Sequence, residues 1–270
     1  MRAMNPEAVT VHIIAWLRAY LEQSGMEGWV VGVSGGIDSA VTSTLCALTG
    51  APTVCVEMPI HQAPEQVSRA SKHIESLCAK HPRARRSTVS LTEVYDTFAK
   101  ALPDGQDESR GLAMANSRAR LRMTTLYALA QRTKSLVAGT GNKVEDFGVG
   151  FYTKYGDGGV DLSPIADLNK TEVFALAAHL GVIEEIQQAA PTDGLWGDDR
   201  TDEDQLGATY PELEWAMGWE SQGRSEDEEA GLPWRQQEVL ATYRRLHCAN
   251  KHKMEPIPVC DVPEDVRFRA

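Results

Sequence analysis

The chain has 270 residues, of which 42% are hydrophobic and 24% are charged. This length predicts one or two domains, and the composition is that of a globular chain rather than a disordered or fibrous one. No apolar run approaches the roughly 18 residues of a membrane span, and the apolar start has no small-residue cleavage signal behind it. Five cysteines without a C-x-x-C pair argue against a disulfide framework or a zinc cluster. We therefore expect a cytoplasmic protein.

The net charge of −11 is concentrated in one segment. Residues 196–230 hold twelve acidic residues against two arginines, a local charge of −10, so the rest of the chain is close to neutral. A protein that binds duplex DNA or tRNA needs a basic face, because neutralised phosphates supply most of its affinity. The sequence shows no such stripe, so we expect no nucleic-acid partner and no membrane partner.

Hydrophobic periodicity predicts strands that alternate with helices. Apolar positions recur at helical spacing over residues 5–23, a short β-branched run at 29–33 indicates a buried strand, and a helix follows at 39–48. The same patterns predict further strands at 53–58, 87–91 and 134–140, and further helices at 64–80, from 92 onward and at 116–131. This alternation indicates an α/β fold: a doubly wound parallel sheet flanked by helices, in a Rossmann-like three-layer architecture and a single domain.

The second half of the chain fits this alternation less well. Residues 142–167 include five glycines within twelve residues, which is typical of a long functional loop and not of a regular element. A capping-box pattern then predicts a helix over 170–180. The acidic segment 196–230 still carries several aromatic residues, so we expect a helical flap that packs intermittently and is mobile over 220–229.

The strongest chemical signal follows the first strand. The chain reads Ser-Gly-Gly-Ile-Asp-Ser from residue 34 to residue 39 and runs directly into a helix. Glycines let backbone N–H groups approach an anion, and a helix N-terminus adds partial positive charge, so the pattern predicts a phosphate site. A bare carboxylate at Asp38 would repel phosphate unless a Mg²⁺ ion lay between them. A plain strand–turn–helix would need neither the serines nor the aspartate.

This loop differs from the two commoner phosphate loops. The chain has no G-x-x-x-x-G-K-[ST] sequence, and no G-x-G-x-x-G follows a strand, so the P-loop kinase and Rossmann dehydrogenase interpretations fail. The sequence S-G-G-x-D-S instead resembles the pyrophosphatase-loop ATP enzymes, which cleave ATP between its α and β phosphates and transfer AMP. That motif is shared by GMP synthetase, asparagine synthetase, tRNA-lysidine synthetase and NAD⁺ synthetase.

A second segment narrows the resemblance. Residues 139–173 read GTGNKVEDFGVGFYTKYGDGGVDLSPIADLNKTEV and resemble ammonia-dependent NAD⁺ synthetases over their whole length. The pattern N-x-R-A-R-x-R-M at 116–123 and the His-Lys pair at 252–253 are similar to the same enzymes. The likeness covers about residues 10–255 of the single domain expected over 1–270.

The resemblance implies a set of site residues. Asp38 and Glu145 would hold Mg²⁺ through hard carboxylate oxygens, and Asp38, Lys170 and Asp161 would be the catalytic residues. The ATP-binding residues would be Gly32, Val33, Ser34, Gly35, Gly36, Ile37, Asp38, Ser39, Thr140, Lys170 and Thr192. The residues that contact deamido-NAD⁺ would be Arg120, Lys154, Asp161, His252 and Lys253.

Some of these assignments have plainer alternatives. Because three arginines alternate within one predicted helix, they cannot all face one ligand; motif position favours Arg120, with Arg122 as the reserve. Glu145 could be a solvated loop acid and Lys170 a surface lysine. The His-Lys pair could equally belong to a solvated terminus.

The resemblance also implies a reaction in two steps. The nicotinate carboxylate of deamido-NAD⁺ attacks the α-phosphorus of ATP and releases pyrophosphate, and ammonia then attacks the acyl adenylate to give NAD⁺ and AMP. Glutamine-dependent relatives carry an additional amidohydrolase domain, whereas the synthetase segment nearly fills this chain, so the expected nitrogen source is ammonia, free or from a separate glutaminase. A homodimer is implied as well. The alternatives are another adenylating ligase, such as a tRNA-modifying enzyme, and a nucleotide-binding subunit without activity.

Overall fold

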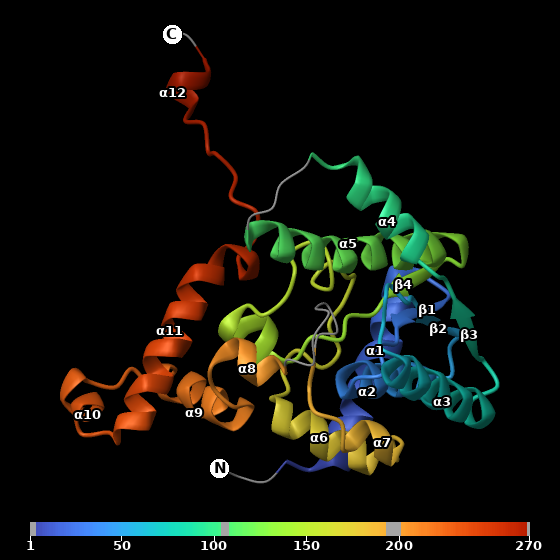
Figure 1. The fold of residues 1–270 in the computed structure, drawn as a ribbon, viewed down its shortest axis with the longest axis horizontal. Coiled ribbons are helices and arrows are strands. Elements are labelled where there is room, and N and C mark those ends of the chain that lie inside the picture. The colour runs from blue at the N-terminus through green and yellow to red at the C-terminus, as the bar shows by residue number, and fades with distance from the viewer. Residues whose placement is uncertain (1–3, 104–107, 193–200, 269–270) are drawn as a thin grey trace.

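A computed structural model describes residues 4–103, 108–192 and 201–268. At its centre lies a parallel sheet of four strands in the order β3-β2-β1-β4 (Figure 1). The strands are β1 (Gly28–Gly32), β2 (Thr53–Glu57), β3 (Ala84–Thr88) and β4 (Ser135–Val137). Every pairing is parallel, so the carboxyl ends of all four strands meet at one edge of the sheet.

Helices connect the strands and continue after the sheet. The helices of the first half are α1 (Pro6–Ser24), α2 (Ile37–Leu48), α3 (Pro64–Lys80), α4 (Thr92–Ala101) and α5 (Glu108–Arg132). After β4 come a π-helix, η1 (Val144–Val149), and then α6 (Lys170–His179), α7 (Glu184–Gln187), α8 (Asp202–Leu206), α9 (Tyr210–Glu220), α10 (Glu226–Ala230), α11 (Trp234–Met254) and α12 (Glu264–Arg267).

Strands β1, β2 and β4 are covered on both faces. Along β1, Trp29 and Val31 pack with α1, α2 and α6, whereas Val30 faces the opposite side together with β2 residues and α5. Successive side chains of a strand point to opposite faces, so a strand covered on both sides needs an uninterrupted apolar run. The residues 29–33 have that pattern, and the expected three-layer α/β architecture is confirmed.

Most predicted elements lie where periodicity placed them, with four differences, one of which is that β4 spans only 135–137 of the predicted 134–140. Helix α3 has the predicted bounds, and the capping box of α6 forms as expected between Asn169 and Glu172. The third strand lies at 84–88 rather than 87–91, because this edge strand carries polar side chains that are exposed or half-exposed and give no apolar signal. Helix α5 begins eight residues before its predicted start. The glycine-rich segment is also not wholly irregular, because it contains η1.

The acidic segment packs more closely than predicted. The structure describes it from residue 201 onward, and its first residues, Trp196 among them, lie outside the described part. In α8 and α9 the side chains of Leu206 and Leu213 are fully buried against η1 and α11. Acidic side chains serve as helix caps and ion-pair partners, since Glu212 pairs with Arg235 at 2.7 Å. Residues 202–216 therefore belong to the packed body, and movement of any of this segment stays a prediction.

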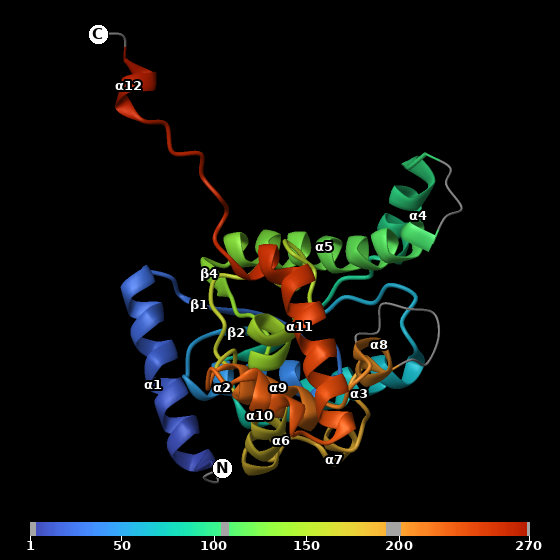
Figure 2. The same ribbon diagram turned by 90° about the vertical axis from the view of Figure 1, so that its left-hand side faces the viewer.

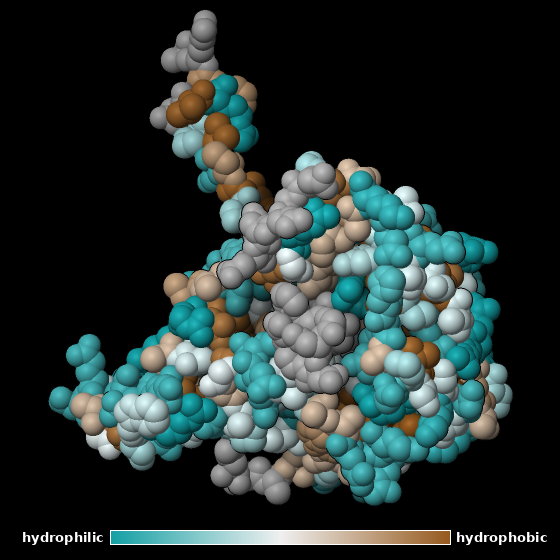
Figure 3. All heavy atoms as spheres, viewed as in Figure 1, coloured by the Kyte–Doolittle hydropathy of each residue, from teal (hydrophilic) through white to brown (hydrophobic). Residues whose placement is uncertain are grey.

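The chain leaves the body after α11. Residues from 255 onward run outward and end in the short helix α12 (Figures 1 and 2). Figure 3 shows a largely hydrophilic face from which the apolar residues of this tail stand out, and Val259 in it is 87% exposed. Within the described ranges, no helix combines the length and the apolar character that crossing a membrane requires.

Candidate active site

The loop over residues 34–39 lies at the carboxyl end of β1 and leads into α2. Two serine hydroxyls hold its turn: Ser39 Oγ donates to the carbonyl of Gly36 at 2.9 Å, and Ser34 Oγ accepts from the N–H of Gly36 at 3.2 Å. Gly36 is the N-cap of α2 and offers no side chain to the first N–H groups of the helix. Those N–H groups remain available to an anion.

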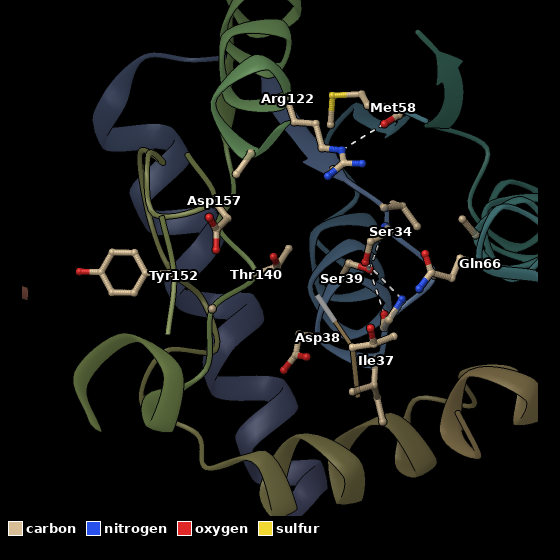
Figure 4. Close-up of a pocket in the computed structure, with 18 of the residues that line it drawn as sticks. Ser34, Ile37, Asp38, Ser39, Met58, Gln66, Arg122, Thr140, Tyr152 and Asp157 are labelled. Carbon is tan, nitrogen blue, oxygen red and sulfur yellow. Dashed lines mark hydrogen bonds between the residues drawn. The ribbon is translucent and has the colours of Figure 1, made fainter. Parts of the chain in front are cut away.

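A cavity of about 270 Å³ opens at this edge of the sheet. Figure 4 shows Asp38, Thr140 and Asp157 around one space, and Arg122 is held beside it by a hydrogen bond of 3.1 Å to the carbonyl of Met58. Ligands of doubly wound α/β sheets bind outside the carboxyl ends of the strands. The cavity therefore lies where this fold places small-molecule sites.

A buried lysine joins three elements in the wall of the cavity. Lys170, the first residue of α6, is 3% exposed, and its Nζ lies 2.6 Å from Asp38 Oδ2 and 3.0 Å from Glu145 Oε1. Burial by itself would lower the pKa of Lys170, but the two carboxylates outweigh burial and raise it above its ordinary value. The ammonium therefore stays charged. Its place at a helix N-terminus is unfavourable for the helix dipole, and the two carboxylates supply the compensating charge.

A further carboxyl lies next to this group. Burial raises the pKa of Asp146 to about 8, and the carboxylates of Glu145, Asp157 and Asp38 act in the same direction. Asp146 therefore holds its proton more strongly than an exposed aspartate does. Its carboxyl lies directly over Gly141, where any side chain would collide with it.

The donor set suits a divalent cation. Asp38 and Glu145 supply hard carboxylate oxygens that converge on a single point, now the Lys170 ammonium. One lysine does not neutralise two carboxylates, so a triphosphate entering the cavity would meet net negative charge. A Mg²⁺ ion between the carboxylates and the phosphates would remove that repulsion, and these residues therefore fit Mg²⁺.

The residues expected to bind ATP come together. All of them line the cavity: Gly32, Val33, Ser34, Gly35, Gly36, Ile37, Asp38, Ser39, Thr140, Lys170 and Thr192. Glu145, expected to hold the metal, lines it too. The plainer interpretations of Glu145 as a solvated acid and Lys170 as a surface lysine do not fit this geometry.

The residues expected to bind the dinucleotide do not line this cavity within the described structure. Three of them lie together outside it, since Arg120 donates to the carbonyl of Lys154 at 3.3 Å and Lys154 donates to that of His252 at 2.6 Å. Lys253 donates to two backbone carbonyls of the glycine-rich segment, each at 2.8 Å. The reserve arginine, Arg122, lines the cavity itself.

Asp161 is not among the described residues that line the cavity, and its hydrogen-bond partners are not Arg120, Lys154 or His252. Its Oδ1 accepts from the Tyr127 hydroxyl at 3.1 Å and its Oδ2 accepts from the N–H of Val137 at 2.8 Å. Both oxygens thus have a partner at the end of β4. This geometry accounts for an aspartate at residue 161 without a ligand, and its catalytic assignment stays a prediction.

No sequence pattern predicted a role for three acidic residues that line the cavity, or for a tyrosine that contacts Glu145. Asp146 and Asp157 line the cavity and lie in the glycine-rich segment, where the sequence pattern singles out Glu145 and the glycines instead. Asp202 lines the cavity, and Tyr210 donates to Glu145, yet both come from the acidic segment, where charge and aromatic content alone do not distinguish them. The adjacency of Asp146 to Glu145 was the one usable signal.

The phosphate loop gives a first prediction. Gly35 has φ +86°, and a Cβ there would lie 2.6 Å from the backbone oxygen of Gln66 in α3. We expect Gly35→Ala to shift the loop and weaken ATP binding at least about tenfold, because strain of roughly 1–3 kcal/mol concentrates at the binding backbone. Calorimetric titration with Mg-ATP measures the effect.

Gly50 provides the matched control. It has φ +78°, and no atom lies within 4 Å of the place that a Cβ would take, so Gly50→Ala carries the conformational cost without the collision. This variant should melt at a lower temperature and bind ATP as the parent chain does. Equal ATP affinity in the two alanine variants would contradict the role of the loop.

Comparison with known proteins shows the family of the chain. The family model described as NAD synthase matches residues 9–257. An NH(3)-dependent NAD(+) synthetase of Archaeoglobus fulgidus is 38% identical over 263 residues, which cover 96% of this chain and 98% of that protein. One from Carboxydothermus hydrogenoformans is 40% identical over 213 residues, which cover 78% and 85% respectively. Among solved structures, the NMN synthetase of Francisella tularensis matches with a TM-score of 0.81 at 30% identity, over 97% of this chain and 100% of that one.

Proposed function

The chain belongs to the NAD synthase family, and we propose that it catalyses the ATP-dependent amidation of deamido-NAD⁺ by ammonia. The products are NAD⁺, AMP and pyrophosphate, formed through an acyl adenylate. The observation that carries this proposal is the cavity at the carboxyl end of β1, where the phosphate loop meets Lys170, Asp38 and Glu145. The five cysteines are free thiols, which is consistent with the cytoplasm as the site of action.

ATP would occupy this cavity with its phosphates against the loop. The N–H groups at the start of α2 and the Lys170 ammonium are donors fixed before the substrate arrives, so little reorganisation is needed as charge develops. Asp38 and Glu145 would hold Mg²⁺, which when bound neutralises phosphate charge. The chain itself supplies positioning and charge stabilisation and needs no covalent intermediate with a side chain.

The deamido-NAD⁺ site is proposed beside the ATP cavity. Arg120, Lys154 and His252 lie together there and offer cationic or neutral donors to a pyrophosphate and a nicotinate carboxylate. Lys253 would act indirectly, because its ammonium orders the backbone carbonyls of residues 150 and 152.

We also propose that two copies of the chain associate. Helix α1 presents Val11 at 64% and Trp16 at 40% exposure, and Trp16 stacks on Tyr20. Exposed apolar residues on the outer face of a helix are typical of a surface that a partner covers. A native mass near twice that of the chain in light scattering is the expected result.

An omission assay tests the proposed reaction. The purified chain with ATP, Mg²⁺, ammonium and deamido-NAD⁺ should release AMP and pyrophosphate in equal amounts, and leaving out any one component should stop NAD⁺ formation. Glutamine in place of ammonium should give no turnover. Release of ADP instead of AMP, or efficient use of glutamine, would contradict the proposal.

One neighbour favours a second candidate substrate. The Francisella tularensis structure, with a TM-score of 0.81, is described as an NMN synthetase, so the acid precursor of NMN is worth testing as an acceptor. The same assay run with the mononucleotide and the dinucleotide acid gives the ratio of kcat/KM values. A higher kcat/KM for the dinucleotide is expected, and the reverse would assign the mononucleotide reaction.

A further inference from the structure

A tyrosine from the acidic segment is buried against Glu145 and Lys170, two residues that line the ATP cavity. Tyr210 is the first residue of α9 and is 3% exposed. Its position is well defined, since its N–H donates to Glu203 at 2.9 Å and α9 is capped by a Thr209–Glu212 capping box. The start of α9 is therefore held in contact with Glu145 and Lys170.

The tyrosine contacts both Glu145 and Lys170. Its hydroxyl donates to Glu145 Oε1 at 2.6 Å, the same oxygen that accepts from Lys170. Its ring centre lies 4.7 Å from Lys170 Nζ, which is within the range of a cation–π contact. One side chain thus fixes the carboxylate through its hydroxyl and the ammonium through its ring.

The hydroxyl lies within reach of two carboxylates. It is closer to Glu145 Oε1, at 2.6 Å, than to Asp202 Oδ2, at 3.3 Å. Among the described residues, none donates to Glu145 Oε2, so this arrangement occupies one oxygen of the carboxylate and leaves the other for a ligand. A carboxylate held in this way presents its second oxygen in a single orientation.

We propose that Tyr210 is a positioning residue for the reaction described above: it orients Glu145 and Lys170 toward the phosphates of ATP. This inference rests on the proposed function and adds to it a residue of α9 that touches neither the phosphate loop nor the dinucleotide site. The acidic segment thereby contributes a residue to the site, because Tyr210 at the start of α9 contacts Glu145 and Lys170.

Tyr210→Phe isolates the hydroxyl while keeping the ring. We expect Mg-ATP to bind about ten- to a hundredfold more weakly, the size of a hydrogen bond to a charged group. The KM for deamido-NAD⁺ should stay within twofold of the parent value. Calorimetric titration with Mg-ATP in the absence of deamido-NAD⁺ measures the first quantity, and the amidation assay measures the second.

Tyr243→Phe is the matched control. Tyr243 is 5% exposed in the same apolar cluster, and no described residue is hydrogen-bonded to its hydroxyl. This variant should bind Mg-ATP as the parent chain does, with circular dichroism confirming that both variants fold. Equal weakening in the two variants would overturn the proposal, because the effect would then come from the cluster as a whole.

A double-mutant cycle tests whether the tyrosine acts through Glu145. In a Glu145→Gln background, adding Tyr210→Phe should change Mg-ATP affinity less than twofold. The same tenfold loss in both backgrounds would overturn the proposal. If the parent chain binds Mg-ATP but forms no NAD⁺, the proposed reaction fails, and the binding comparison still decides the role of Tyr210.

Discussion

Lys170→Met is expected to abolish pyrophosphate release, with kcat reduced at least about a thousandfold, because it removes a fixed donor from the phosphate site. The substitution should also destabilise the chain. Asp38 and Glu145 are 17% and 15% exposed at the side chain, so loss of the ammonium leaves two largely buried carboxylates facing each other. We expect the free energy of unfolding to fall by about 3–5 kcal/mol in denaturant titrations without nucleotide.

Two control experiments distinguish the loss of the Lys170 charge from a general destabilisation of the fold. Lys143→Met removes a lysine whose partner, Asp167, is 96% exposed, so it should change stability by less than about 0.5 kcal/mol and leave turnover unchanged. Added Mg²⁺ should restore more stability to the Lys170 variant than to the parent chain, since it can compensate the two carboxylates that have lost their partner. Full turnover by Lys170→Met would contradict the assignment.

Asp38→Asn is expected to stop pyrophosphate release while the fold is retained. Asparagine keeps the volume of the side chain but lacks the charge that pairs with Lys170 at 2.6 Å and suits a hard cation. The rate of pyrophosphate release should fall at least about a hundredfold. The circular dichroism spectrum should match that of the parent chain.

An exposed carboxylate, that of Asp167, supplies the control for this prediction. Asp167→Asn makes the same chemical change on an exposed side chain and should leave both the rate and its dependence on Mg²⁺ unaltered. In the Asp38 variant, raising Mg²⁺ should not recover the parent rate. Turnover at the parent rate in Asp38→Asn would refute its role in holding the metal.

The acidic segment shows where composition misleads. Its charge of −10 and its aromatic residues predict a helical flap that packs only intermittently, yet Tyr210 and Leu213 are buried in it. Several of its carboxylates act locally, as Glu212 does by capping α9 and pairing with Arg235. A net charge does not show which cations pair with the carboxylates. Arg235 of α11 comes within reach of Glu212 only because α9 packs on α11.

The arginines of α5 show the limit of motif position. Arg120 and Arg122 both belong to the pattern that resembles the family, and the helix turns them in different directions. Arg122 reaches the cavity and donates to Gln62 at 2.7 Å, whereas Arg120 lies near Lys154 outside it. The rotation of a helix about its axis is set by the core on which it packs, which a local motif does not contain.

Local rules predicted the alternation of strands and helices up to α6, and the phosphate loop, because these depend on residues that are neighbours in the chain. They placed residues 32–39, which are the loop and the two residues before it, in one site, and the structure has all eight in the lining of the cavity. The tertiary structure alone decided which side chains complete the site. Lys170 lies 132 residues from Asp38 and Tyr210 lies 65 residues from Glu145, and only packing between distant elements brings such pairs within a hydrogen bond of each other.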